Sequence, residues 1–298
     1  MSTIKTVTLA GASGALGTPL LQALLDAGFT VTALTRESST QSFPSSVKVA
    51  KVDYNDVDGL TVALKGQDAL ISALGTTSID SQYHLIDAAV AAGVKRIIPS
   101  EFGCDIDHPK AAVMPVYQPK IQIRKHIEEK IKGTSTTYTY VINNMFLDWT
   151  MDHGWGVEPK NRRMEMFDGG ETPYTATPIP FVAKGTAAVL QHPEETQNRS
   201  VKLHGTGLTQ KQLLEISKRA LGGDIDVTHS STGEGEKEAF EILAKDPGNV
   251  MGWVMPMLKR CAFGEGYGGD FSGDNDNKLL GLVDLSDEEV EDIVRSKA

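Results

Sequence analysis

The chain has 298 residues, of which 40 % are hydrophobic and 23 % are charged, a composition that is ordinary for a folded protein with a full hydrophobic core. The net charge of −10 is spread along the chain, with its densest acidic stretch at residues 284–292, which argues against nucleic acid as a direct partner. With two cysteines, no apolar stretch near ~18 residues and a first segment, MSTIKTVTLAG, that leads into a strand without a signal peptide, we expect a soluble cytoplasmic protein that contacts no membrane.

The first half of the chain alternates strand and helix patterns. Strands are predicted at TVTLAG (6–11), TVTALTR (30–36), VKVAKVDY (47–54), DALISALG (68–75) and RIIPSEF (96–102), with helices over about 14–27, from Asp56, and up to Gly93. Gly28 and Gly93 each follow an apolar helix and suit the left-handed position after its end, and Asp56 can cap the helix that it begins. The alternation predicts an α/β fold, a Rossmann-type doubly wound parallel sheet.

The second half is less regular. PKIQIRKHIEEKIKG (119–133) predicts a helix with Ile123, Ile127 and Ile131 on one face, and TYTYVINNMF (137–146) predicts a strand. Beyond residue 150, helices are expected near 181–191, 209–221 and 234–245 among segments rich in proline and glycine. We expect a dinucleotide-binding domain over 1–150 and, over 151–298, a smaller substrate-binding region from which some segments return to the sheet. The Gly- and Asp-rich stretch 263–277 is interpreted as a mobile surface loop or as a lid over a pocket.

Three glycines follow the first predicted strand at a spacing of three residues. Gly11 permits a tight turn, Gly14 lets a pyrophosphate approach the backbone, and Gly17 lets the next helix pack closely on the strand. The N-terminus of that helix supplies N–H groups and a positive dipole end to phosphates. A glycine pattern alone is a weak indication, but its place in the first strand–helix unit predicts dinucleotide binding.

The end of the second predicted strand bears on which cofactor is bound. An acidic residue there is typical of NAD, whereas LTRESS offers Arg36, whose guanidinium can pair with a 2′-phosphate. This favours NADP. Glu37 follows directly and is the argument for NAD.

A reductase needs a group that exchanges a proton beside the nicotinamide. Tyr117 and Lys120 are one residue short of the Tyr-x-x-x-Lys spacing that places both side chains on one helix face, and Pro119 disfavours helix at the residue before it. Lys120 begins the helix after the fifth strand, near the sheet edge where open α/β sheets bind ligands. A desolvated lysine facing an oxidised nicotinamide would have a lowered pKa and could serve as general acid or base, whereas a solvated lysine in a first helical turn needs no such role.

GASGALG, LTRES, ISALG, IIPSEFGCDID, YQPKIQIRKHIE and YTYVINNMF together resemble, across nearly the whole chain, the isoflavone reductase-like or phenylcoumaran benzylic ether reductase-like branch of the NmrA-like atypical short-chain dehydrogenases, and fungal members above all. The resemblance implies that Lys120 is the catalytic residue and that NADPH is the cofactor. It further implies cofactor contacts from Gly11, Ser13, Gly14, Ala15, Leu16, Gly17, Arg36, Ser72, Ala73, Leu74, Gly75, Ser100, Glu101, Phe102, Lys120, Asn144 and Phe146.

The family resemblance implies an NADPH-dependent reductase of secondary metabolism that transfers a hydride to an aromatic or conjugated small molecule, with Lys120 as general acid or base. Two alternatives stay open: a dinucleotide-binding redox sensor that does not turn over, and an isomerase or dehydratase that holds the cofactor without consuming it. The loop after Arg36 is short and lacks a further lysine that many relatives carry, and the C-terminal region matches the plant reductases only loosely.

Aromatic and sulfur side chains flank these segments. Met114, Tyr117, His153 and Trp155 are candidates for an apolar substrate pocket or, equally, for ordinary internal packing. Cys104 and Cys261 show no arrangement typical of a nucleophile, and the histidine spacing indicates no metal site. A monomer or a homodimer is expected.

Overall fold

The computed structural model describes residues 3–298 and divides them into two compact units. The first unit comprises residues 3–102, Pro119–Val141 and Ile179–Val201, and the second comprises Gly103–Gln118, Ile142–Pro178 and Lys202–Ala298. The chain leaves the first unit after Phe102, returns at Pro119, leaves after Val141, returns at Ile179 and leaves again after Val201. The division at residue 150 into a dinucleotide-binding domain and a substrate-binding region stays a prediction.

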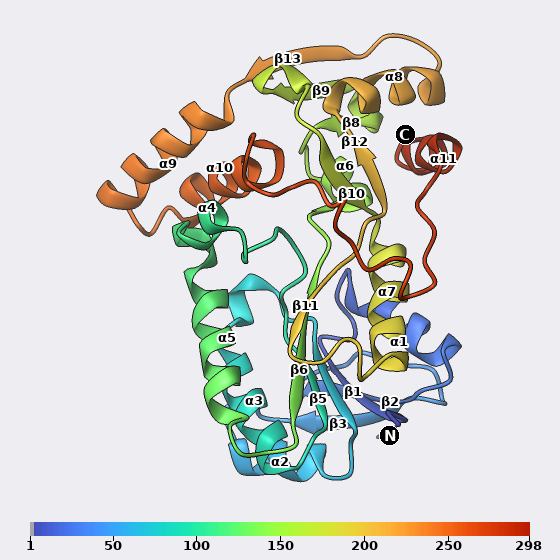
Figure 1. Cartoon of the computed structure of the whole chain (residues 1–298), viewed down its shortest axis with the longest axis vertical. Helices are drawn as coiled ribbons and strands as arrows, with labels where there is room; N and C mark the ends of the chain where they lie inside the picture. The colour runs from blue at the N-terminus through green and yellow to red at the C-terminus, as the bar shows by residue number, and fades with distance from the viewer. Residues whose placement is uncertain (1–2) are drawn as a thin grey trace. The chain divides into compact units, whose positions relative to one another are not determined.

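A seven-stranded sheet in the order β11-β6-β5-β4-β1-β2-β3 forms the centre of the first unit (Figure 1). The strands are β1 Thr6–Ala10, β2 Thr30–Arg36, β3 Lys48–Val52, β4 Ala69–Ser72, β5 Arg96–Ile98, β6 Thr137–Ile142 and β11 Arg199–Lys202. All pairings from β3 across to β6 are parallel. The order reverses at β1, which lies between β2 and β4, so the predicted doubly wound sheet is confirmed.

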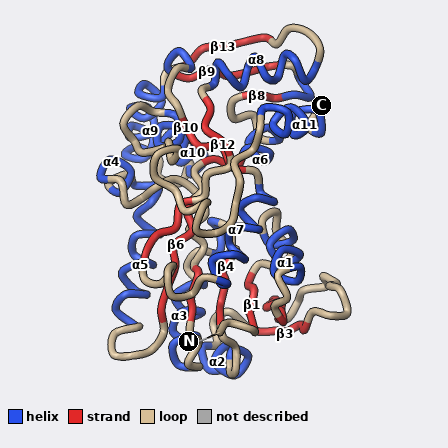
Figure 2. Tube along the Cα trace, turned by 45° about the vertical axis from the view of Figure 1, so that its right-hand side comes forward, coloured by secondary structure: helices blue, strands red, loops and turns tan. Residues whose placement is uncertain are grey.

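Helices cover both faces of this sheet (Figures 1 and 2). They are α1 Gly17–Asp26, α2 Val57–Leu64, α3 Ser81–Ala91, α5 Gln118–Lys130 and α7 Ile179–Gln191, with a 3-10 turn η1 at Thr76–Ser78. The leucines of α2 and α3 and the isoleucines Ile123 and Ile127 of α5 pack in one apolar cluster with Leu70 and Ile97 of the sheet. Helices α1 and α7 pack against each other on the other face. Burial on both faces explains why the strands are almost continuously apolar.

The glycines predicted to follow two helices do so, whereas two predictions about helix starts differ from the structure. Gly28 (φ +83°) and Gly93 (φ +74°) take the left-handed conformation after α1 and α3, as expected. Helix α1 begins at Gly17 and not near Gly14, because the N–H of Gly14 closes a turn on the carbonyl of Gly11 at 3.0 Å. Asp56 occupies the N-cap position of α2, but its side chain makes no capping hydrogen bond, so its predicted capping role is wrong.

The predicted strand over 137–146 is two strands in different sheets. Strand β6 ends at Ile142, and Asn144 takes the left-handed conformation with φ +52°. Asparagine tolerates this conformation better than other residues with a side chain, so it can redirect the chain here. The next two residues, Met145–Phe146, form β7 in a sheet of the second unit.

The second unit holds two three-stranded sheets, β12-β10-β7 and β13-β9-β8. Its other strands are β8 Val157–Glu158, β9 Arg163–Phe167, β10 Tyr174–Thr177, β12 Thr206–Leu208 and β13 Asp226–Ser230. Its helices are α4 Pro109–Ala112, α6 Leu147–Asp152, α8 Gln210–Leu221, α9 Thr232–Lys245, α10 Val250–Phe263 and α11 Asp287–Ser296, with 3-10 turns η2 Pro115–Tyr117, η3 Pro159–Asn161 and η4 Asp168–Gly170. Among residues 3–298, no helix combines the length and apolar character needed to cross a bilayer.

The stretch 263–277 is anchored in the second unit by several buried residues, with exposed residues between them, and its interpretation as a mobile loop or a lid stays a prediction. Phe271 is 1 % exposed, and its N–H donates to the hydroxyl of Thr175 at 2.8 Å. The carbonyl of Gly269 accepts the N–H of the same threonine at 2.8 Å. Tyr267 and Asn277 are buried as well, and the glycine- and aspartate-rich composition does not reveal these anchors.

Candidate functional site

The glycine turn after β1 is held in a geometry that only glycine permits. Gly11 has φ +82°, and a β-carbon there would lie 2.5 Å from the carbonyl oxygen of Ala73. No side chain caps the first turn of α1. The N–H of Thr18 donates to the carbonyl of Gly14 at 3.0 Å and Pro19 has no N–H, so an anion at this helix start would bind the N–H of Gly17 and those of the preceding turn. The absence of a side chain at Gly11 and Gly14 leaves the backbone open to it.

A pocket of about 810 Å³ lies beside this turn in the first unit. Its lining comes from the loops that follow four neighbouring strands: Gly11, Ala12 and Ser13 after β1, Leu34–Gln41 at the end of β2 and beyond it, Val52–Asn55 after β3, and Leu74, Ser78 and Ser81 after β4. These are the carboxyl ends of parallel strands on both sides of β1, where the strand order reverses. Open α/β sheets bind their ligands at this point.

Arg36 ends β2 and lines the pocket with the hydroxyl-bearing residues Ser38, Ser39 and Thr40. The ammonium of Lys51 donates to the carbonyl of Ser39 at 3.1 Å and so ties this loop to β3. Burial raises the pKa of Tyr54 to about 12, although the positive charge of Arg36 acts in the opposite direction. One guanidinium beside several hydroxyls is a donor set that suits a phosphate group.

The turns after β4 and β5 are tied together by hydrogen bonds. The hydroxyl of Ser100 donates to the carbonyl of Leu74 at 2.7 Å, and the N–H of Ser100 donates to the side chain of Gln82 at 2.7 Å. The hydroxyl of Ser72 is buried and has no hydrogen-bond partner among the described residues. The predicted residues 72–75 and 100–102 thus lie at the same edge of the sheet as the glycine turn.

Lys120 lies in the first turn of α5, and its ammonium donates a hydrogen bond to the backbone carbonyl of Glu101. The carboxylate of the same glutamate pairs with Arg124 at 2.8 Å. Lys120 is therefore fixed at the end of β5, in the same unit as the glycine turn and the pocket. Within this unit the structure brings together the predicted residues of the glycine turn, the end of β2, the two tied turns and Lys120.

Two further predicted cofactor contacts, Asn144 and Phe146, belong to the second unit. Asn144 is buried, and its side-chain amide donates to the carbonyl of Thr175 at 2.9 Å. Its side-chain oxygen is buried with no partner among residues 3–298. A left-handed asparagine with an orphaned oxygen is the kind of strained polar residue that gathers at functional sites. Its role stays a prediction.

The four predicted substrate residues also lie in the second unit. Met114, Tyr117 and Trp155 are buried there, and Trp155 packs in the apolar core with Met151. His153 is exposed and stacks on Trp149 with 3.7 Å between ring centroids. Burial raises the pKa of Tyr117 well above its ordinary value, so this phenol stays protonated. Substrate contact by these four residues stays a prediction.

Sequence reasoning missed several residues of the site. The pocket-lining residues Asp53–Asn55 follow β3, which ends at Val52, whereas the predicted strand ran on to Tyr54; only Asn55 directly follows the predicted strand. Gln82 and Arg124 gave no such indication, because their contacts join helices to the turn after β5 through tertiary structure alone.

Residues 3–238 match the model of the NmrA-like family. The chain belongs to this family. It is 32 % identical to the oxidoreductase aprR of Aspergillus flavus over 99 % of this chain and 98 % of the relative. It is 30 % identical to phenylcoumaran benzylic ether reductase PT1 of Pinus taeda over 83 % of each chain. Within the family it therefore belongs to the isoflavone reductase-like oxidoreductases, which confirms the resemblance inferred from the motifs.

The fold agrees with this assignment. The structure of leucoanthocyanidin reductase of Vitis vinifera in a binary complex with NADPH superposes with a TM-score of 0.79, at 21 % identity, over 97 % of this chain and 99 % of that one. At this identity the likeness establishes the shared fold.

Proposed function

We propose that this protein is an NADPH-dependent reductase of aromatic or conjugated small molecules, in which Lys120 acts as general acid or base. The observation that carries the proposal is the hydrogen bond between the ammonium of Lys120 and the carbonyl of Glu101. It fixes a proton-exchanging group at the carboxyl edge of a sheet whose glycine turn and pocket suit a dinucleotide.

The residues present fit NADPH. The uncapped start of α1 and the bare backbone of the turn would hold the pyrophosphate, and Arg36 with the hydroxyls of the following loop would hold the 2′-phosphate. A solved relative of the same fold carries NADPH, as its name states. When bound, the cofactor supplies a hydride to an electrophilic carbon of the substrate.

The chain's own residues then have separate tasks. The turn and pocket bind and orient the cofactor, and the tie between Ser100 and Leu74 keeps the ends of β4 and β5 at a fixed separation. Lys120 Nζ gives a proton to an oxygen of the substrate, or takes one from it, as charge develops there. The names of relatives such as phenylcoumaran benzylic ether reductase support an aromatic ether or a conjugated aromatic compound as substrate.

The test follows NADPH absorbance with a panel of aromatic enones, isoflavones and benzylic ethers. Wild type and Lys120→Ala are compared after NADPH binding by both has been verified. We expect substrate-dependent loss of NADPH in wild type alone. Binding without turnover on any compound would instead indicate a redox sensor, and a changed product without loss of NADPH would indicate an isomerase or dehydratase.

A further inference from the structure

Two side chains of helix α5 bind Glu101, one at its backbone carbonyl and the other at its carboxylate. The backbone carbonyl of Glu101 accepts a hydrogen bond from Lys120, and its carboxylate accepts one from Arg124 at 2.8 Å. Lys120 and Arg124 are four residues apart and so lie one above the other on α5. The side chains of Glu101 and Arg124 are 4 % and 10 % exposed, so their ion pair is withdrawn from water.

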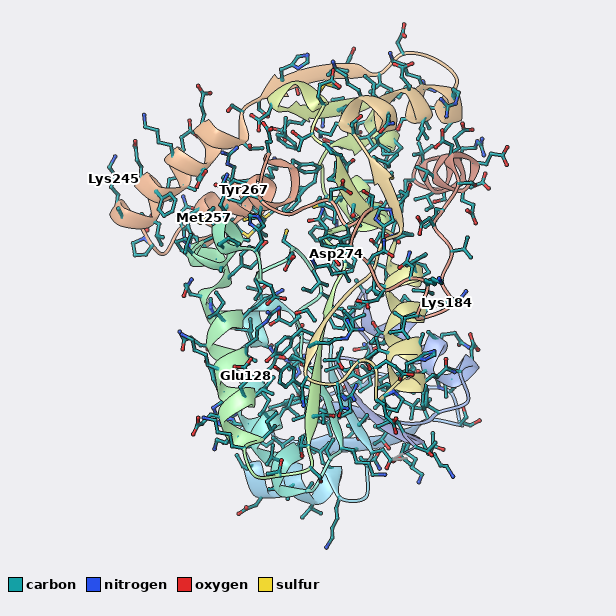
Figure 3. The ribbon with its side chains drawn as sticks, in the orientation of Figure 1. Glu128, Lys184, Lys245, Met257, Tyr267 and Asp274 are labelled. Carbon is teal, nitrogen blue, oxygen red and sulfur yellow. The ribbon has the colours of Figure 1, made fainter. Side chains whose placement is uncertain are left out.

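The guanidinium of Arg124 is also fixed from the side of the sheet. It lies over the ring of Tyr140 on β6, 4.2 Å from the centroid. The hydroxyl of Tyr140 donates to the carboxylate of Glu128 at 3.3 Å, and Glu128 lies one turn further along α5 (Figure 3). Burial, followed by the charge of Glu128, raises the pKa of Tyr140, so this phenol stays protonated. Arg124 therefore has little freedom to move.

A buried ion pair of this kind is weak evidence for stability, because removing both charges from water costs about as much as their attraction returns. Its geometric effect is clearer. With its carboxylate bound to a fixed guanidinium, Glu101 holds its carbonyl in one place, and that carbonyl holds the ammonium of Lys120.

We propose that Glu101 and Arg124 are positioning residues that fix the ammonium of Lys120 at the end of β5 and balance the charge around it. The proposal rests on the proposed function for its catalytic meaning. The charged and titratable groups around Lys120 and its two partners include Arg124 and Glu128 from α5, Glu101 from the segment after β5, and Tyr140 with its stacked neighbour Tyr138 from β6.

The charges of the two positioning residues shift the pKa of Lys120 in opposite directions. Removing the carboxylate of Glu101 leaves the positive charge of Arg124 uncompensated and disfavours the charged ammonium, so the pKa of Lys120 falls. Removing the guanidinium leaves the carboxylate uncompensated, so this pKa rises. Removing both charges together leaves neither uncompensated, so the pKa of Lys120 returns toward its wild-type value. A purely structural role would not produce opposite signs, because damage to the fold acts alike in both variants.

The experiment titrates Lys120 in protein labelled with [ε-13C]lysine and followed by NMR, without cofactor or substrate. The Lys120 resonance is assigned by its loss in Lys120→Arg. The variants are Glu101→Gln, Arg124→Gln and the double variant. Glu129→Gln is the control, because Glu129 on the same helix pairs with Lys132 while both are 70 % exposed. Circular dichroism verifies folding. Glu101→Gln keeps an oxygen that can accept from Arg124, so it provides the lower-risk arm if Arg124→Gln fails to fold.

We expect the Lys120 midpoint to fall by about one pH unit in Glu101→Gln, to rise by a similar amount in Arg124→Gln, and to return toward wild type in the double variant. The control variant Glu129→Gln should leave the Lys120 midpoint unchanged. Midpoints that stay at the wild-type value, or that move the same way in both single variants, would overturn the proposal. If only Glu101→Gln folds, an unchanged or raised Lys120 midpoint in that variant is sufficient to overturn the proposal.

Turnover separates this proposal from the proposed function. With a compound that wild type reduces, both single variants should lose at least about tenfold in kcat while the Kd for NADPH stays the same. If Lys120→Met keeps wild-type turnover, the catalytic role of Lys120 is wrong, whatever the titration shows. If Lys120→Met is inactive while both single variants keep wild-type kcat, the positioning role is wrong and the catalytic role stands.

Discussion

Gly17 packs so closely on Gly11 that a β-carbon at residue 17 would lie 1.9 Å from the carbonyl oxygen of residue 11. The neighbouring atoms are backbone and cannot rotate away. The start of α1 is therefore placed against the turn after β1 by the absence of one methyl group, and the predicted role of the third glycine in close packing is confirmed.

Gly17→Ala should accordingly displace α1 from the turn. We expect a loss of about 1–3 kcal/mol in stability, from forced overpacking, together with weakened NADPH binding. Thermal unfolding and cofactor titration measure the two effects. Gly273→Ala is the matched control, because a β-carbon there meets nothing within 4 Å. Wild-type NADPH affinity in Gly17→Ala would show that the turn does not hold the cofactor.

Arg36→Gln should weaken NADPH binding and leave NADH binding unchanged. The guanidinium is the one side-chain cation among the residues that line the described pocket, and a charge-assisted contact of about 1.5–3 kcal/mol corresponds to a 10- to 150-fold rise in Kd. Calorimetric titration with each cofactor provides the measurement, with NADH as the internal control. An equal loss for both cofactors would mean that Arg36 does not read the 2′-phosphate.

The sequence predicted the first unit well because its determinants are local. Apolar runs, the glycines that end α1 and α3, and the periodicity of α5 each act over a few residues and agree with one another. The break at Asn144 escaped prediction although two asparagines interrupt TYTYVINNMF, because the apolar residues on both sides of them continue the strand pattern.

Helices α10 and α11 were also missed, for different reasons. The segment of α10, VMGWVMPMLKRCAF, carries a glycine and Pro256 inside the helix and shows no clear polar face. Helix α11 was taken as an acidic stretch, although Ser286 and Glu289 form a capping box at its start and Val290 and Val294 bury its apolar face. Of the candidate site, strand ends and glycines were predictable, whereas the pairing of Glu101 with Arg124 depends on tertiary contacts.

His204 makes the stability of the second unit sensitive to pH. The hydroxyl of Thr175 accepts the N–H of Phe271 and lies 2.9 Å from Nδ1 of His204, within hydrogen-bond distance. The imidazole is 3 % exposed, so its charged form is withdrawn from water. Burial lowers the pKa of His204 below its ordinary 6.5, although the charges of Asp284 and Asp270 oppose this.

The folded state binds a proton at His204 less readily than the unfolded state. The contribution of neutral His204 to the free energy of unfolding is therefore complete above about pH 6.5 and is lost as the pH falls through the lowered pKa of His204. The melting temperature of wild type should thus fall more between pH 7.5 and pH 5 than that of His204→Gln. His229→Gln, at an exposed position on β13, should follow the wild-type curve. Parallel curves for wild type and His204→Gln would contradict this account.

The central claim is that Lys120 supports a hydride transfer from NADPH, and single-turnover transfer of deuterium tests it most directly. Wild type and Lys120→Met, each shown to bind NADPH, are mixed with a reducible aromatic compound and with either C4-deuterated epimer of the cofactor, and the product is analysed by mass spectrometry. We predict that wild type places deuterium from one epimer on a product carbon, and that Lys120→Met binds NADPH with the same affinity but transfers at least about 100-fold more slowly. Equal transfer by both proteins, or a product that carries no deuterium from either epimer, would contradict the claim.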